Sequence, residues 1–130
     1  MTRAIGFGAA LLLPLLAMAD GASTKAPAYS VKDEVVVSGK VVDVKTIPDW
    51  MGKDGVNLTI EGEKDKAPHV DVAPARFLAM LDVALAVGDQ LEVRGCWSQS
   101  ADGSPVFLVH QIKKQRTTLN VRGPDGTPLW

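Results

Sequence analysis

Short runs of β-branched and other apolar residues, separated by turn residues, fill the chain from residue 34 onward. In the clearest run, VNLTIEGE, Val56, Leu58 and Ile60 alternate with polar residues. This period of two predicts a β-strand with one buried face and one exposed face. Similar runs predict further strands at 34–47, 69–73, 90–98 and 105–114, and a short sixth strand around Leu119 and Val121.

One helix is predicted between the third and fourth strands. Pro74 suits the first turn of a helix, and Phe77, Leu78 and Leu81 follow at helical spacing, so the helix should run from about Pro74 to Leu81. Gly39 lies within the long first run, where glycine often marks a bend or bulge. The order β-β-β-α-β-β predicts an all-β fold with one short helix: a five-stranded OB-fold Greek-key barrel plus a short C-terminal strand and tail. Another small all-β barrel or sandwich is the alternative.

The first 19 residues have the features of a secretory signal peptide. Arg3 supplies a positive charge, a short apolar run follows, and Ala17–Ala19 forms an A-x-A cleavage pattern. We therefore expect cleavage after Ala19 and export to the periplasm or beyond the cell. No later run is apolar for long enough to span a bilayer. We predict a flexible N-terminal segment at 20–33, an OB-fold domain at 34–116 and a C-terminal extension at 117–130.

Charge and cysteine content narrow the function classes. The mature chain carries 13 Lys and Arg against 15 Asp and Glu, a formal charge of −2, and so lacks the basic field of most nucleic-acid binders. The single cysteine, Cys96, cannot form an internal disulfide, so the core must hold the fold. We expect no enzyme activity, because neither His69 nor His110 lies in a catalytic motif. We expect one basic group to be a solvated edge, with contact to an anionic surface or partner as the alternative: Lys113, Lys114, Arg116 and Arg122.

Four blocks of sequence carry a family resemblance: VVVSGKVVDV, VDVAP, GDQLEVRG and HQIKK. They resemble the bacterial OB-fold (BOF) family of small exported proteins over about Val35–Lys114. The shared positions are mostly strand hydrophobics and turn glycines. The resemblance implies a periplasmic OB domain with a link to stress responses, and binding of small ligands or cations.

An OB-fold binds its ligands on the face of strands two and three, between loops 1–2 and 4–5. Loop 1–2 is KTIPDWMGKDG and loop 4–5 is SQSADGS. Trp50 is predicted either to stack on a ligand or to fold back as a lid, and Trp97 to join either the site or the core. The outward residues of the two strands suit a cation, a sugar or a basic protein segment. The predicted ligand-binding residues are Trp50, Met51, Asn57, Thr59, His69, Asp71 and Trp97.

The position of Cys96 depends on the register of the last hairpin. A two-residue turn at Asp102-Gly103 would place Cys96 opposite Val109 and His110 over Gly95. Cys96 would then point outward, on the side opposite His110, unless a single bulge turned the two together. The core side of the hairpin would hold Leu91, Val93, Trp97, Leu108 and Ile112.

Three functions remain open at this point. The first is a non-catalytic, exported binding module for a small ligand or a protein partner, with no cofactor. The second is a metal or haem chaperone that uses Cys96, His110 and His69, with methionines as soft ligands. The third and weakest is single-stranded nucleic-acid binding, which many OB domains perform.

Overall fold

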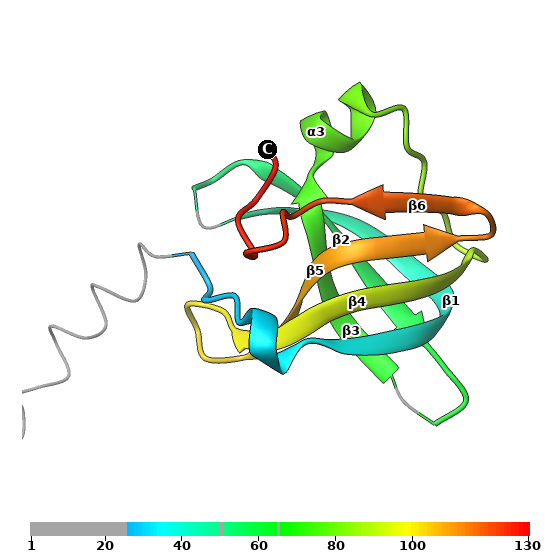
Figure 1. Cartoon of the computed structure of the whole chain (residues 1–130), viewed down its shortest axis with the longest axis horizontal. Helices are drawn as coiled ribbons and strands as arrows, with labels where there is room; N and C mark the ends of the chain where they lie inside the picture. Colours follow the sequence, from blue (N-terminus) through cyan, green and yellow to red (C-terminus); the bar gives the residue numbers. More distant parts are fainter. Residues whose placement is uncertain (1–25, 50, 65) are drawn as a thin grey trace, which may run out of the picture.

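The computed structural model describes residues 26–49, 51–64 and 66–130. The predicted signal peptide and Trp50 therefore lie outside the described residues. Figure 1 shows a curved sheet that closes on itself, with one short helix at an end of the ring. The elements are, in order, η1 (Val31–Asp33), β1 (Val35–Pro48), β2 (Asp54–Glu61), β3 (Lys66–Pro74), α3 (Ala75–Met80), β4 (Gln90–Gln99), β5 (Pro105–Lys114) and β6 (Thr117–Asn120).

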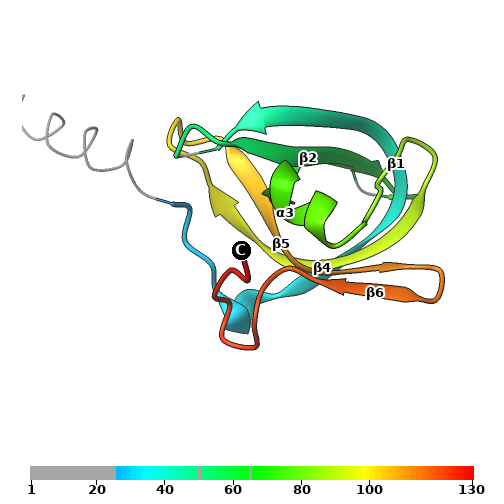
Figure 2. The ribbon, with the colours of Figure 1, turned by 90° about the horizontal axis from the view of Figure 1, so that it is seen from above.

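The strand connections define a closed barrel. The sheet order is β3-β2-β1-β4-β5-β6, and an additional parallel pairing of β3 with β5 closes the ring. Helix α3 follows β3 and covers one end of the barrel, as Figure 2 shows from above. The predicted all-β fold of the OB type, with a short helix between strands three and four and a short sixth strand, is confirmed. No helix in 26–49, 51–64 or 66–130 is both long and apolar enough to cross a membrane.

The long first strand bends because it changes partners. Its first part, Val35–Lys40, pairs with β4, and its second part, Lys40–Pro48, pairs with β2, with a bulge between Val41 and Asp43. Gly39 lies at the change of partners. A Cβ on Gly39 would stand 2.5 Å from the carbonyl oxygen of Glu61, so only glycine allows this close approach.

The barrel interior is filled by alternating aliphatic residues from every strand and one phenylalanine. Phe107 is fully buried at its centre, and Leu78 of α3 closes one end. The remaining buried members of this core are Val41, Leu58, Ile60, Ala67, Val70, Val72, Ala73, Leu91, Val93, Val109, Ile112, Leu119 and Val121. The alternation read from the sequence therefore identifies most of the interior.

The predicted register of the β4–β5 hairpin is correct near its open end and wrong near its turn. Val93 pairs with Ile112 as expected, but Gly95 pairs with Val109 and Cys96 with Leu108. The turn holds three residues between Ser100 and Ser104, whose backbone groups are hydrogen bonded, and this shifts the pairing by one residue. The sequence ADGS fits both turn lengths, because Gly103 supplies the left-handed position in either case.

One extra residue in β5 restores the register. His110 is a bulge, since Arg94 pairs with Gln111 and the next residue, Gly95, pairs with Val109. Leu108, predicted to face the core, therefore points away from it, and Phe107 and Val109 fill the interior instead. His110 likewise lies on the outer side of the sheet rather than over Gly95.

The two ends of the described chain pack together against this outer side. Tyr29 covers a small second cluster of Cys96, Val106 and Leu108. A Cβ on Gly126 of the C-terminal tail would stand only 2.7 Å from the Tyr29 ring, so the tail and the N-terminal segment are in direct contact. Residues 26–33, expected to be flexible, therefore make contacts with the barrel and with the tail.

Candidate functional site

A cleft of about 840 Å³ opens at the end of the barrel beside α3. Four segments form its walls: the N-terminal segment around Tyr29, the loop between β1 and β2, the end of β3 with the start of α3, and the C-terminal tail. Most of its lining is apolar, with a few charged groups among it. This combination is typical of sites that bind small organic ligands.

The C-terminal tail forms one wall of the cleft through an aromatic contact. Trp130 packs against Phe77 of α3 with ring centroids 5.8 Å apart. Met51, Met80 and Leu129 also line the cleft and are more than half exposed. An apolar ligand would therefore cover side chains that water now contacts, which favours binding.

Asp71 is the charged residue on β3 that lines the cleft. Its carboxylate has no hydrogen bond or ion pair with any residue in the part of the chain that the structure describes. Burial raises the pKa of Asp71 above its ordinary value, although the charges of His69 and Arg122 oppose this. Asp71 is half-buried, so a ligand that covers it without donating to it would leave a buried acceptor unpaired, whereas a ligand that donates to it avoids this cost.

Asn57 lies beside Asp71 in the sheet, because the two residues are direct cross-strand partners. Asn57 is 8% exposed, and its Oδ1 is buried with no hydrogen-bond partner among the described residues. Two neighbouring polar side chains on β2 and β3 thus lack protein partners. Such unsatisfied groups are uncommon in folded proteins and often mark functional positions.

Arg122 follows β6, lies beside β5 and is held in place from several sides. Its Nε donates to the carbonyl oxygen of Val109 at 3.2 Å, and its Nη1 donates to that of Gly126 at 2.8 Å. The guanidinium stands 4.6 Å from the Tyr29 ring centroid and 5.5 Å from that of Trp130. Burial lowers the pKa of Arg122, which remains a cation because an arginine pKa begins so high.

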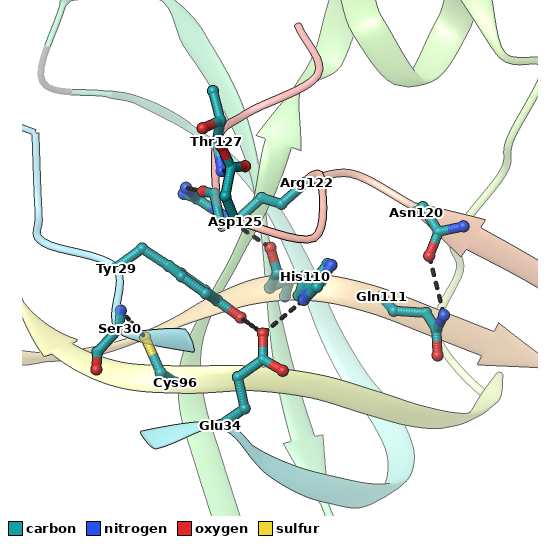
Figure 3. A network of polar contacts seen from close by, with 12 residues as sticks. Tyr29, Ser30, Glu34, Cys96, His110, Gln111, Asn120, Arg122, Asp125 and Thr127 are labelled. Carbon is teal, nitrogen blue, oxygen red and sulfur yellow. Dashed lines mark hydrogen bonds and ion pairs between the residues drawn. The ribbon is translucent and has the colours of Figure 1, made fainter. Parts of the chain in front are cut away.

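A second polar group lies on the outer side of the sheet, next to the cleft (Figure 3). His110 Nδ1 lies 2.5 Å from Glu34 Oε2, and the Tyr29 hydroxyl donates to the same oxygen. The backbone N–H of Ser30 points to Cys96 Sγ at 3.3 Å. Burial disfavours ionisation of Glu34, but the hydrogen bonds from Tyr29 and His110 outweigh it and hold the pKa of Glu34 below its ordinary value. This group ties the N-terminal segment to the barrel.

The predicted ligand-binding residues divide into two sets. Met51 and Asp71 line the cleft, and Asp49 and Met51 flank Trp50, which is not described. Four other predicted residues do not line it. Asn57 is buried rather than outward-facing, and His69 is half-buried on β3. Thr59 donates to the carbonyl oxygen of Pro68, and Trp97 is 47% exposed and packs edge-on against Phe107 with ring centroids 5.0 Å apart.

The predicted site lay between loops 1–2 and 4–5, and only one of these loops borders the described cleft. Loop 1–2 borders the cleft, but residues 98–101 of loop 4–5 border a separate, smaller hollow beside Ala26–Ala28. The described cleft is displaced toward α3 and the C-terminal tail. The tail occupies this position because Leu129 N–H donates to the carbonyl oxygen of Val121 and turns the chain back.

The three candidate metal ligands, Cys96, His110 and His69, are not brought together as one group. The bulge does bring Cys96 and His110 to one side of the sheet, but Cys96 is fully buried rather than outward and solvent-facing, and His110 contacts Glu34. His69 lies on another strand, β3. Among the described residues, no group of three or more His, Cys, Asp or Glu is arranged to hold a metal ion.

The predicted basic edge is also divided. Lys114 forms an ion pair with Asp89 at 3.0 Å, and Lys113 lies in β5 opposite Thr118. Arg122 leaves this edge and joins the cleft instead.

The sequence does not predict the aromatic residues and the arginine of the cleft, which are Tyr29, Phe77, Trp130 and Arg122. Tyr29 and Trp130 lie in segments predicted to be a flexible N-terminal segment and a C-terminal extension, and Phe77 is predicted only as a helix residue. The one available signal was composition, because these segments hold the chain's only tyrosine and one of its three tryptophans. Large aromatic side chains outside predicted elements often pack onto a surface.

Fold and cleft together define a small barrel of the OB type with a ligand-sized cleft at its helix-capped end. A protein-family model matches residues 34–119, and it is that of the MamS/MamX magnetosome protein family. Because this match spans most of the chain, the protein belongs to that family. The resemblance to the BOF family was therefore wrong, since the shared blocks consist of strand hydrophobics and turn glycines that many small barrels need. The expected link to stress responses rested on that resemblance alone. No curated protein matches the sequence.

Proposed function

We propose that the protein is a non-catalytic, exported binding module that takes a small organic ligand into the cleft beside α3. The observation that carries this proposal is Asp71, a half-buried carboxylate with no hydrogen-bond or ion-pair partner among the described residues, in an apolar cleft of about 840 Å³. A ligand that fills the cleft would bury this carboxylate further and must therefore satisfy it. The ligand would supply a hydrogen-bond donor or a positive charge to Asp71 and apolar surface to the walls.

The walls support an organic ligand over a bare cation. The walls include the aromatic and thioether side chains of Phe77, Met80 and Trp130. Contact with these apolar side chains contributes little free energy to the binding of a small hydrated ion. A bare cation would also need several oxygen or nitrogen ligands together. A polyanion such as single-stranded nucleic acid is disfavoured by the overall charge, because the full sequence carries 14 Lys and Arg against 15 Asp and Glu.

The proposed setting combines two independent indications. The predicted signal peptide favours export from the cytoplasm, and the family is described by its name as one of magnetosome proteins. We therefore propose that the protein binds its ligand outside the cytoplasm, in association with the magnetosome.

Tryptophan fluorescence tests the proposed site. In a Trp50→Phe/Trp97→Phe variant, Trp130 is the only remaining tryptophan and reports on the cleft wall. This variant is titrated with a panel of amino acids, short peptides, sugars and organic amines. We expect saturable changes for at least one class, and at least a tenfold loss of affinity in Asp71→Asn. Asp43→Asn is the matched control, because Asp43 pairs with Lys45 on the exposed side of β1 and does not line the cleft. Equal losses in both variants would contradict the proposed site.

A protein partner is the second candidate. Met80 is 77% exposed and Met51 58% exposed at the cleft rim, and flexible thioethers adapt to partner surfaces. The Asp71→Asn variant separates the candidates. It should weaken uptake of a small ligand at least tenfold, and it should weaken a protein complex held by the exposed methionines much less.

A further inference from the structure

Two opposite charges line the same cleft but do not meet. Asp71 and Arg122 both belong to its walls, and each influences the charge of the other. No ion pair or hydrogen bond joins them among the residues described. Opposite charges in a low-dielectric site normally pair directly when they can reach each other. Here Arg122 is held back by the carbonyl oxygens of Val109 and Gly126.

Arg122 retains unused donor capacity. A guanidinium has five N–H donors, and only Nε and Nη1 have protein acceptors within 26–49, 51–64 and 66–130. The Tyr29 and Trp130 rings lie against the group and fix its orientation. The remaining Nη2 is therefore a preoriented donor for an anion such as a carboxylate.

The other charged groups of the cleft differ from this pair. The Asp49 side chain is occupied within its own loop, where its Oδ1 accepts from the backbone N–H groups of Met51 and Lys53. Lys53 and Arg76 stand at exposed positions, where water solvates them. Asp71 and Arg122 are thus the two lining charges that burial makes selective.

We infer that the ligand is a small zwitterion with an apolar body, of the class of a free α-amino acid with an apolar side chain. This inference rests on the proposed function and names the ligand class of the same cleft. The ammonium group donates to Asp71, the carboxylate accepts from Arg122, and the apolar side chain lies against Phe77, Met80 and Trp130. Such a ligand bridges the two charges and covers apolar surface at the same time. A ligand with only one of the charges leaves the other buried without a partner, which costs affinity.

Matched analogues test the charge pattern. The Trp50→Phe/Trp97→Phe variant is titrated with L-leucine, with 3-methylbutylamine, which lacks the carboxylate, and with 4-methylpentanoate, which lacks the ammonium group. L-phenylalanine, 2-phenylethylamine and 3-phenylpropanoate form a second set with a larger apolar body. We expect the zwitterion in at least one set to bind at least tenfold more tightly than both of its singly charged analogues.

Substitution assigns each charge to its residue. Asp71→Asn should weaken the zwitterion at least tenfold and leave the binding of the carboxylate analogue unchanged or stronger, because the opposed anion is gone. Asp43→Asn should change neither. Arg122→Lys keeps the charge while losing the fixed geometry, and should weaken both ligands that carry a carboxylate. Because Arg122 also holds the tail, the circular dichroism spectrum and the urea midpoint of the Arg122→Lys variant are compared with those of the unsubstituted chain.

The outcomes separate the inference from the function on which it rests. The inference that the ligand is a zwitterion is overturned if the zwitterion and its singly charged analogues bind equally well, or if Asp71→Asn does not weaken the binding of the zwitterion. Saturable binding of a sugar or an uncharged ligand at the Asp71 site, without any response to amino acids, overturns it while leaving the proposed function standing. If no ligand class changes the fluorescence of Trp130, both fall.

Discussion

Gly95 lies where β4 approaches β5 most closely, and replacing it should be among the most damaging single changes in the barrel. A Cβ built on Gly95 would stand 2.0 Å from the carbonyl oxygen of Leu108 and 2.9 Å from the ring of Phe107. A normal contact requires well over 3 Å, so β5 must move by about 1 Å or more. That movement is resisted on two sides, because Leu108 pairs with Cys96 on β4 and with Asp71 on β3.

We expect Gly95→Ala to lower the free energy of unfolding by about 3 kcal/mol, at the upper end of the usual cost of overpacking a core. For a domain of this size that loss corresponds to a drop in melting temperature of roughly 10–20 °C. Urea denaturation followed by circular dichroism measures the loss, with the m-value checked for constancy.

Gly55→Ala is the matched control in another strand. Its Cβ would meet nothing closer than 3.4 Å, so its cost should stay below about 1 kcal/mol. If the free energy of unfolding of Gly95→Ala lies within about 0.5 kcal/mol of that of the parent chain, β4 and β5 do not approach as closely as the structure has them. That result would also refute the bulge at His110.

Three further predictions concern the ionisable and thiol groups. Because folding lowers the pKa of Glu34, its stabilising effect is present above its unfolded pKa and disappears as the pH falls through the folded pKa. Glu34→Gln should therefore lose less melting temperature than the parent chain between about pH 6 and about pH 3, which bracket the ordinary carboxyl range. An equal loss in both chains would contradict the Glu34 contacts. Folding raises the pKa of Asp71, so the free energy of unfolding falls as the pH rises from the unfolded pKa to the folded pKa of this group. Asp71→Asn should therefore raise the melting temperature at neutral pH but not in acid. A gain in acid and none at neutral pH would refute the burial of Asp71. Cys96 is fully buried beneath Tyr29, so the Cys96 thiol should react slowly with a thiol reagent in the native chain and at least tenfold faster in Tyr29→Ala. Equal rates would mean that Tyr29 does not cover Cys96.

Several parts of the fold are visible in the sequence because they depend on local rules. The alternation in VNLTIEGE places Leu58 and Ile60 in the core wherever the strand pairs, since side chains in a strand alternate between faces. Pro74 marks the start of α3, and Gly39 marks the bend of β1, because both residues restrict or permit particular backbone conformations. Hence the order of elements and the class of barrel could be predicted.

The candidate site could be predicted only in part. Met51 and Asp71 were found because OB architecture points to loop 1–2 and to β3. The register near Cys96 was mispredicted, since a turn of two residues and a turn of three fit the same ADGS sequence, and one residue of difference reverses every side chain that follows.

The sequence by itself thus determined the strands, the helix, the barrel class and most of the core, all of which follow from periodicity and backbone preference within short windows. Only the tertiary structure decided the cleft, because its walls come from residues far apart in the chain. The guanidinium of Arg122 lies 4.6 Å from the ring centroid of Tyr29, which is more than 90 residues earlier in the chain, and the ring of Phe77 packs against that of Trp130. No local pattern encodes such contacts, because they form only when the closed barrel leaves an end that both terminal segments can cover. At that end Asp71 has no partner among the described residues.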